Sequence, residues 1–176
     1  PFHADIMRCA IVHYHELALK GRNRDFFEQR LVRNLRLALK DLKIRRIESL
    51  QGRIRVTIPD EVTPDLVTER LRRTCGVSNF LLTESVPLDL TAPDLTTTGK
   101  AVKLKQPDLT LYIELLTKEA HVAARKIQGP GGMPVGTSGK VACLISGGID
   151  SPVAAYRMMK RGCKAVFVHF SGRPLV

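Results

Sequence analysis

The sequence predicts a chain of more than one domain, of mixed α+β and α/β class, and three observations lead to this prediction. In the first half, short apolar runs alternate with two amphipathic stretches, which is typical of a small α+β layer. A Gly- and Pro-rich segment, Gly129–Gly139, then interrupts the hydrophobic pattern and indicates a linker. Beyond it, strand, glycine-rich turn, helix and strand patterns follow one another, as in a βαβ unit with a parallel strand pair.

The first half shows the order strand, helix, strand, helix, strand. The apolar run Cys9–Tyr14 predicts the first strand, and Asn23–Leu42 carries an apolar and a basic stripe at helical spacing. Alternation at Arg53–Ile58 predicts a half-exposed strand. Thr63 offers a capping hydroxyl and Pro64 suits the first turn of a helix that runs to about residue 75. With a further strand from residue 80, this order predicts a ferredoxin-like domain.

The second half predicts four more strands and one helix. The strands are expected at 110–115, 120–125, 140–145 and 165–169, and the helix at 152–161. The last two strands and the helix form the βαβ unit. Because a parallel sheet needs more strands and helices on both faces, we expect this final domain to be incomplete.

Positive charge is concentrated near the N-terminus. The chain has 28 Lys and Arg residues against 17 Asp and Glu, a formal net charge of +11. Residues 20–55 hold twelve of the basic residues and four acidic ones. A solvated helix face is one interpretation, but this concentration favours a surface that neutralises the phosphates of a polyanion. We expect that surface to be formed by Lys20, Arg22, Arg24, Arg30, Arg33, Arg36, Lys40 and Lys43.

Several classes of protein are disfavoured by composition. No run of about 18 apolar residues predicts a transmembrane helix, and no leader pattern predicts secretion. The four cysteines are scattered without a C-x-x-C pair, which indicates the thiols of a reducing compartment. We therefore expect a cytoplasmic protein without membrane contact. His13 and His15 share a strand side but lack a third ligand, so no metal centre is predicted there.

The sharpest local signal is SGGIDS, Ser146–Ser151, between a strand and a helix. Successive glycines let a backbone turn tightly and aim its N–H groups at one point, and the helix adds its positive end. A tight turn that needs glycine for packing is the alternative. The two hydroxyls, the carboxylate and the strand context favour an anion cradle, placed where α/β proteins bind nucleotides. The candidate catalytic residues are Ser146 and Asp150.

This loop resembles the PP-loop, SGGxDS, of ATP pyrophosphatases, which cleave ATP between the α and β phosphates and transfer AMP to a substrate oxygen. The resemblance implies ATP and Mg²⁺ as cofactors, with the loop holding the pyrophosphate and Asp150 in a magnesium-linked or loop-shaping role. Neighbouring strand ends would flank the adenosine; a general-base role for His169 is an alternative. The candidate cofactor-binding residues are Leu144, Ile145, Ser146, Gly147, Gly148, Asp150, Ser151, His169 and Phe170.

Nearly the whole chain resembles one family, the tRNA uridine 4-sulfurtransferases (ThiI). The segments that carry the resemblance are Glu16–Leu35, Gly52–Val56, Cys75–Phe80, Lys105–Leu115 and Gly129–Phe170. It implies a ferredoxin-like N-terminal domain at 1–84, part of a THUMP RNA-binding domain at 85–133, and the start of a Rossmann-like PP-loop domain at 134–176. Few residues stand between 87 and 102, where the family has a much longer segment, so the THUMP domain is expected to be incomplete.

The resemblance also implies a reaction. The family adenylates the C4 oxygen of a tRNA uridine and replaces it with persulfide-derived sulfur, giving 4-thiouridine, with a cysteine desulfurase as sulfur donor. A role in thiamine thiazole synthesis and pairing into homodimers are implied as well. None of the four cysteines matches the family's catalytic cysteine, so we assign none and expect the chain alone to be inactive.

Two other functions are compatible with the residues. A PP-loop ligase or amidotransferase that acts on a small molecule would form AMP without tRNA. A non-catalytic tRNA-binding protein would bind RNA and would not turn over ATP.

Overall fold

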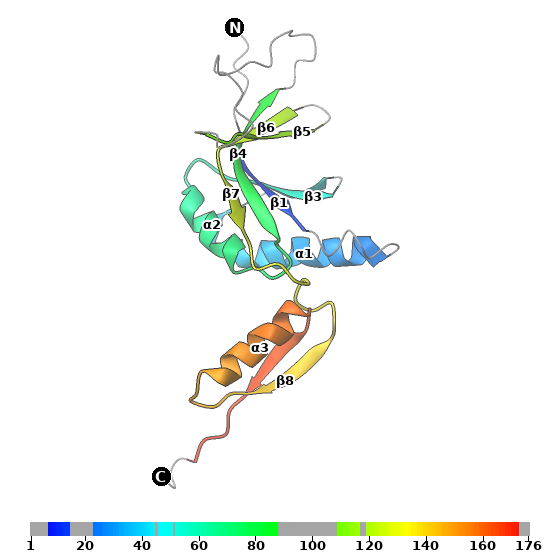
Figure 1. The fold of residues 1–176 in the computed structure, drawn as a ribbon, viewed down its shortest axis with the longest axis vertical. Helices are drawn as coiled ribbons and strands as arrows, with labels where there is room; N and C mark the ends of the chain where they lie inside the picture. Colours follow the sequence, from blue (N-terminus) through cyan, green and yellow to red (C-terminus); the bar gives the residue numbers. More distant parts are fainter. Residues whose placement is uncertain are drawn as a thin grey trace.

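The computed structural model of the protein describes residues 7–14, 23–44, 46–50, 52–87, 109–116 and 119–172. It contains a helix–sheet body and, beyond it along the long axis of Figure 1, a smaller unit of two strands and one helix. In chain order the elements are β1 (Arg8–His13), α1 (Arg24–Ala38), the 3₁₀ turn η3 (Lys40–Leu42), β2 (Ile47–Leu50), β3 (Arg53–Thr57), α2 (Pro64–Arg72), β4 (Asn79–Pro87), β5 (Tyr112–Leu115), β6 (Glu119–Ala123), β7 (Lys126–Gln128), β8 (Lys140–Leu144), α3 (Asp150–Lys160) and β9 (Lys164–Val168).

The larger body is built on one antiparallel sheet with strand order β2-β3-β1-β4-β6-β5, and β7 also pairs with β4. Its first part has the chain order βαββαβ, which confirms the predicted ferredoxin-like fold. Strand β2 is absent from the sequence prediction, because its four residues, IESL, hold only two apolar side chains at an edge of the sheet. Strands β5, β6 and β7 extend the same sheet beyond β4.

Helices α1 and α2 cover one face of this sheet and enclose the main core (Figure 1). Ala10 and Val12 of β1 point to this face because alternate strand residues share a side. The helices contribute Leu31 and Leu35 from α1 and Leu71 from α2, all without exposed surface. Burying one such leucine contributes about 1.5 to 3 kcal/mol. The core therefore fixes α1 with its basic side outward.

The start of α2 differs from the prediction in one respect. Thr63 is the N-cap residue and has an extended backbone, and Pro64 opens the helix as expected. The predicted capping by the Thr63 hydroxyl is wrong, because that side chain makes no capping hydrogen bond. Asp65 in the first turn still interacts favourably with the positive end of the helix dipole.

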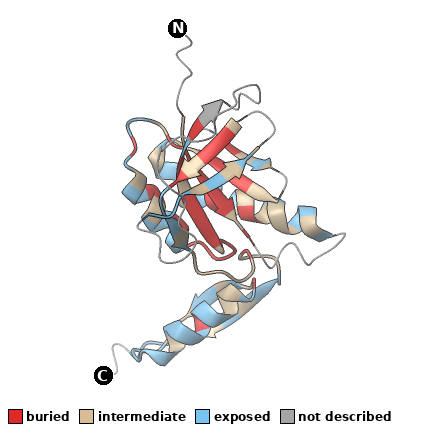
Figure 2. Cartoon of the chain, turned by 45° about the horizontal axis from the view of Figure 1, so that its top comes forward, coloured by how far each residue is buried: buried red, intermediate tan, exposed pale blue. Residues whose placement is uncertain are grey.

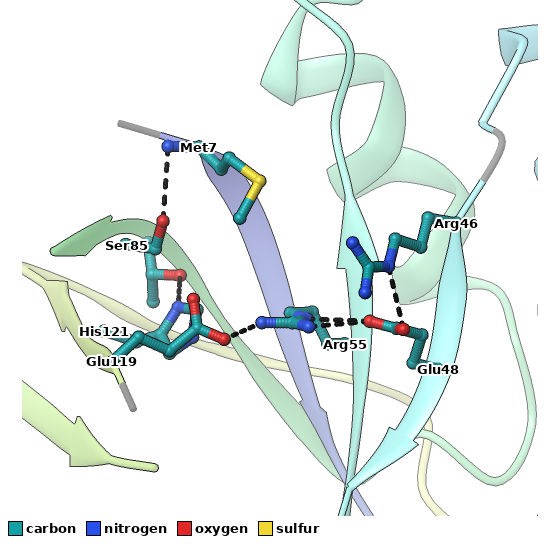
Figure 3. A network of polar contacts seen from close by, with 8 residues as sticks. Met7, Arg46, Glu48, Arg55, Ser85, Glu119 and His121 are labelled. Carbon is teal, nitrogen blue, oxygen red and sulfur yellow. Dashed lines mark hydrogen bonds and ion pairs between the residues drawn. The ribbon is translucent and has the colours of Figure 1, made fainter. Parts of the chain in front are cut away.

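The opposite face of the sheet carries a buried polar network (Figure 3). The Arg55 side chain is only 9% exposed, and its Nη2 lies 2.7 Å from Glu48 Oε2. The same guanidinium pairs with Glu119, so two carboxylates compensate one buried charge. Next to it, His121 is fully buried, and its Nδ1 lies 3.1 Å from Thr83 Oγ1. This network links the ferredoxin-like strand β3 to β6.

The fully buried His121 makes stability depend on pH. Burial lowers the pKa of its imidazole from 6.5, and the nearby Arg55 guanidinium lowers that pKa further. The 3.8 Å gap between His121 Nε2 and the Glu119 carboxylate is too long for a hydrogen bond, and the Glu114 carboxylate, which raises the pKa, acts more weakly than burial and Arg55. In the unfolded chain the ring takes up a proton near pH 6.5, so the unfolded state binds more protons below that pH.

We therefore expect the free energy of unfolding to fall as the pH drops from 7 towards 5, and a His121→Asn variant to lose most of that slope. Urea titrations at several pH values measure it. The pKa of Glu48 is also lowered, by its hydrogen bond to Arg55. Its contribution to the free energy of unfolding is lost only as the pH falls below about 4.5, so it does not overlap with the effect of His121 between pH 7 and 5. An equal slope in the variant and the parent would contradict the assignment to His121.

The smaller unit confirms the predicted βαβ arrangement. Strands β8 and β9 run parallel, with Lys140 opposite Lys164 and Leu144 opposite Val168. Helix α3 packs on this pair and buries Ala155, while most of the unit is exposed (Figure 2). Among the described residues, no helix combines the length and the apolar character that crossing a bilayer requires.

Candidate anion-binding loop and basic helix

The SGGIDS loop lies at the carboxyl end of the parallel strand pair, as expected. Strand β8 ends at Leu144, and the Ile145 N–H continues the ladder by donating to the Val168 carbonyl at 2.8 Å. Helix α3 begins at Asp150, inside the motif, with Ile149 as its N-cap residue. The loop therefore faces the positive end of an 11-residue helix.

Hydrogen bonds join the first and last residues of the motif. The Ser146 N–H donates to Ser151 Oγ at 3.2 Å, and the two serine hydroxyl oxygens lie 3.3 Å apart. The Gly148 N–H lies 3.4 Å from Ser146 Oγ. These contacts close the loop, with Ser146 exposed at its rim and Ser151 half-buried. The structure thus brings together three of the predicted residues, Ser146, Gly148 and Ser151.

The two glycines of the loop are not required by the fold of the chain. Neither Gly147 nor Gly148 has a backbone in the left-handed region. A Cβ added at Gly147 would meet nothing within 4 Å, and one at Gly148 would meet only the Ser146 hydroxyl at 3.7 Å. A turn that needs glycine for packing would show a positive φ or a close neighbour. The open space suits a ligand that approaches the backbone closely.

The strand ends beside the loop carry the residues predicted to flank a nucleotide base. His169 Nδ1 lies 2.8 Å from the Ile145 carbonyl oxygen, so the ring donates there and keeps Nε2 free of a proton when neutral. Leu144 and Phe170 are 65% and 80% exposed.

The basic stripe of α1 lies opposite the buried stripe, but its members are not equivalent. Arg33, Arg36 and Lys40 are exposed, and Lys43 follows them on the surface after η3. The predicted residues Lys20 and Arg22 lie outside the described residues.

Among the described residues, three of the predicted basic residues make contacts within the protein: Arg24, Arg30 and, through one long hydrogen bond, Arg36, whose Nη2 lies 3.5 Å from the Ile47 carbonyl oxygen. Arg24 Nη2 lies 3.4 Å from the Tyr14 hydroxyl, and Arg24 Nε lies 3.7 Å from Glu28 Oε2. Burial and the hydrogen bond to Glu28 raise the pKa of Tyr14 to about 12. Arg30 is partly buried, with its guanidinium carbon 6.0 Å from the Phe26 ring centroid. The exposed positive charge therefore lies on the second half of α1, at Arg33 and Arg36, and directly after the helix, at Lys40 and Lys43.

Sequence reasoning missed two residues near this surface. Phe26 is 50% exposed on the basic side of α1 beside Arg30, at the i, i+4 spacing that a helical wheel reveals. Asn34 donates through Nδ2 to the Val135 carbonyl at 3.0 Å, which joins α1 to the segment before β8. No local pattern announces this second contact, because it spans a hundred residues of sequence.

Comparison with known proteins adds family information to this geometry. Residues 9–80 match the family model described as the ThiI ferredoxin-like domain, and residues 136–176 match the model of the thiamine biosynthesis protein (ThiI). A probable tRNA sulfurtransferase of Moorella thermoacetica is 32% identical over 206 residues, covering 93% of this chain and 52% of the relative. A probable tRNA sulfurtransferase of Thermus thermophilus is 34% identical over 208 residues, covering 93% of this chain and 50% of the relative.

The chain thus spans about half the length of the curated relatives it matches. The alignments run over 206 and 208 residues although the chain has 176, so each includes positions at which this chain has no residue.

Two solved structures share the fold. PH1313 from Pyrococcus horikoshii Ot3 matches with a TM-score of 0.80 at 24% identity, over 95% of this chain and 69% of that chain. A 4-thiouridine synthetase, solved in complex with RNA and with bound ATP, matches with a TM-score of 0.74 at 26% identity. That match covers 96% of this chain and 54% of the other.

Proposed function

Since the chain belongs to the ThiI family, we propose that it is part of an ATP-dependent tRNA sulfurtransferase that converts a tRNA uridine to 4-thiouridine. The observation that carries the proposal is the open SGGIDS loop, whose glycines leave room that no atom of the described part of this chain fills. The exposed basic half of α1 supplies the second requirement, a surface for a polyanionic substrate.

The chemistry follows from the poor leaving ability of a carbonyl oxygen. In the proposed reaction the uridine O4 attacks the α-phosphorus of ATP, the bond to the bridging oxygen breaks and pyrophosphate leaves. The outer sulfur of a persulfide would then attack C4, and AMP would depart with O4, which leaves the uridine linked to the carrier cysteine through an S–S bond. A second thiol, also outside this chain, would attack the sulfur of the carrier cysteine, so that the S–S bond breaks, 4-thiouridine is released and a disulfide forms. The proposed sulfur source is a cysteine desulfurase, which supplies the persulfide through a cysteine outside this chain.

Each part of the loop has a proposed role. The amides of Gly147 and Gly148 and the hydroxyls of Ser146 and Ser151 would hold the phosphates, helped by the helix dipole. Asp150 is the carboxylate that could hold Mg²⁺, an ion that neutralises phosphate charge when bound. The adenosine would lie between the strand-end residues Leu144, Ile145, His169 and Phe170.

The body of the tRNA would bind to the basic side of α1, at a distance from the loop. The residues proposed to contact it are Arg33, Arg36, Lys40 and Lys43, and Lys20, Arg22, Arg24 and Arg30 would extend that surface. The domain division at 1–84, 85–133 and 134–176 belongs to the proposal, with the middle part as an incomplete THUMP module. So do a cytoplasmic site of action and a homodimer. The description of the model that matches residues 136–176 supports a further role in thiamine biosynthesis.

The proposal is tested by incubating the full-length protein with ATP, Mg²⁺, unmodified tRNA, a cysteine desulfurase and cysteine. Mass spectrometry of the digested tRNA should then show a nucleoside 16 mass units heavier than uridine, because sulfur replaces one oxygen. Omission of ATP should prevent its formation. If the full-length protein binds tRNA and ATP but gives no thiolated nucleoside, the proposal is wrong.

A further inference from the structure

The segment between β7 and β8, Gly129–Gly139, is not a free linker. Its composition, rich in glycine, suggests a flexible coil. In the structure it is hydrogen-bonded on both sides. We infer that this segment, which we name the connector, rigidly couples the SGGIDS unit to α1 and thereby fixes the distance and orientation of the loop relative to the basic surface; this rests on the proposed function.

On one side the connector is bound to the ferredoxin-like body. The Gly131 N–H donates to the Val77 carbonyl at 2.7 Å, and the Gly76 N–H donates to the Gly131 carbonyl at 2.9 Å. Asn34 of α1 donates to the Val135 carbonyl at 3.0 Å. The buried Pro134 packs so closely on Gly76 that a Cβ there would lie 3.0 Å from its ring.

On the other side the connector binds the end of α3. The Met133 N–H donates to the Lys160 carbonyl at 2.8 Å. The Gly162 carbonyl accepts from the Gly136 N–H at 2.7 Å and from the Ser138 N–H at 3.0 Å. These bonds satisfy carbonyl groups that the end of a helix leaves without a partner. Helix α3 thus has one end on the connector and the other at the SGGIDS loop, about 16 Å away for 11 residues.

Steric contacts make this junction intolerant of displacement. Gly162 has a φ of +89°, and a Cβ there would lie 2.3 Å from Thr137 Oγ1 and 2.8 Å from Ser138 Oγ. Each hydroxyl is held by a hydrogen bond, since Thr137 Oγ1 donates to the Pro134 carbonyl and Ser138 Oγ to the Arg161 carbonyl, both at 2.8 Å. A side chain at Gly162 therefore either breaks these two hydrogen bonds of the junction or shifts α3, and the loop with it, against the connector.

Gly139 provides the matched control. It has a φ of +80°, close to that of Gly162, but a Cβ there would meet nothing within 4 Å. Both Gly162→Ala and Gly139→Ala introduce the backbone strain of an alanine with a positive φ. Only Gly162→Ala also introduces a steric clash between α3 and the connector. Gly132→Ala is a second displacing variant, since its Cβ would lie 2.4 Å from the Lys160 carbonyl oxygen.

The coupling itself is measured by hydrogen exchange of the full-length protein. We expect the amides of the connector to exchange at least about 100-fold more slowly than in an unstructured peptide. Asn34→Ala should speed their exchange about fivefold by removing one hydrogen bond, whereas Gln29→Ala, on the same helix, should not. Unprotected connector amides in the parent protein would overturn the inference, whatever its enzymatic activity.

The positioning effect is measured by the kinetics of tRNA thiolation. Gly162→Ala should lower kcat about tenfold or more, because a misplacement of about 1 Å is costly to a reaction, while Kd for tRNA stays within about twofold. Gly139→Ala should retain the parent kcat. If Gly162→Ala fails to fold, as judged by its melting curve, Gly132→Ala takes its place. A fully active displacing variant contradicts the inference; a parent without thiolation activity refutes the proposed function, and the exchange data alone then decide the coupling.

Discussion

Replacement of Gly147 by valine should lower AMP formation by about 100-fold or more and leave the protein as stable as its parent. The structure gives both halves of this expectation. A Cβ at Gly147 meets nothing of the protein within 4 Å and the backbone there does not need glycine, so folding should tolerate the change. The same space is the one proposed for the phosphates, and filling it should exclude them.

The effects of the Gly147→Val change on activity and on stability distinguish a loop that binds phosphate from a tight turn that needs glycine for packing. A glycine needed for a tight turn would produce a loss of stability on substitution, about 1 kcal/mol or more. A glycine needed by a ligand leaves the melting temperature unchanged. Gly139→Val is an instructive comparison, since its positive φ predicts a loss of stability without any effect on ATP binding. A Gly147→Val protein with normal AMP formation would remove the loop from the site.

The polar groups of the same loop should behave alike. Ser146→Ala removes a hydroxyl that lies 3.3 Å from Ser151 Oγ, and Asp150→Ala removes the carboxylate at the start of α3. We expect each change to abolish AMP formation and to leave tRNA binding intact, because the basic surface is on another helix. Unchanged turnover in either variant would exclude that residue from the proposed catalytic pair.

Reversing the charges of Arg33 and Arg36 should weaken tRNA binding about tenfold to hundredfold and flatten its dependence on salt. Both side chains are exposed on α1, opposite the stripe that contains Leu31 and Leu35. Removal of one ion pair with a phosphate lowers the slope of log Kd against log salt by about one, so the Arg33→Glu, Arg36→Glu double variant should lower it by about two.

The control for this experiment carries the same change of net charge elsewhere. Arg72 and Arg73 are exposed at the end of α2, and Arg73 already pairs with Glu69 at 3.0 Å. Their double reversal should leave the salt slope nearly unchanged. Equal effects of the two double variants would show that the whole positive charge, and not the side of α1, attracts the tRNA.

The fold was largely predictable because periodicity reports which face of an element is buried. The stripe with Leu31 and Leu35 and the βαβ pattern after residue 139 both correspond to the structure. Strands β2 and β7, with four and three residues, are too short to show a period. Their pairing is decided by neighbouring strands, which local sequence does not reveal.

The sequence predicted which residues form the candidate site, but it did not predict the contacts and open space around them. SGGIDS identified the loop, but only the structure shows that Gly147 has open space beside it. Charge counting gave Arg24 and Arg30 the same weight as Arg33, although Tyr14 and Glu28 engage Arg24. Similarly, the composition of the connector concealed a segment that is hydrogen-bonded on both sides. For the connector, partners distant in sequence determine the outcome, whereas the open space beside Gly147 and the contacts of Arg24 are features of the local three-dimensional arrangement.

The central claim is that one enzyme joins an ATP-binding loop to a tRNA-binding surface. Its most direct test is the release of AMP from ATP by the full-length protein, supplied with a cysteine desulfurase, cysteine and a thiol reductant, with and without unmodified tRNA. We expect AMP release that depends on tRNA, with pyrophosphate as the second product in equal amount. Release at the same rate without tRNA would contradict the claim and favour a ligase or amidotransferase that acts on a small molecule. A protein that binds tRNA normally but releases no AMP would also contradict the claim, and would indicate a non-catalytic tRNA-binding protein.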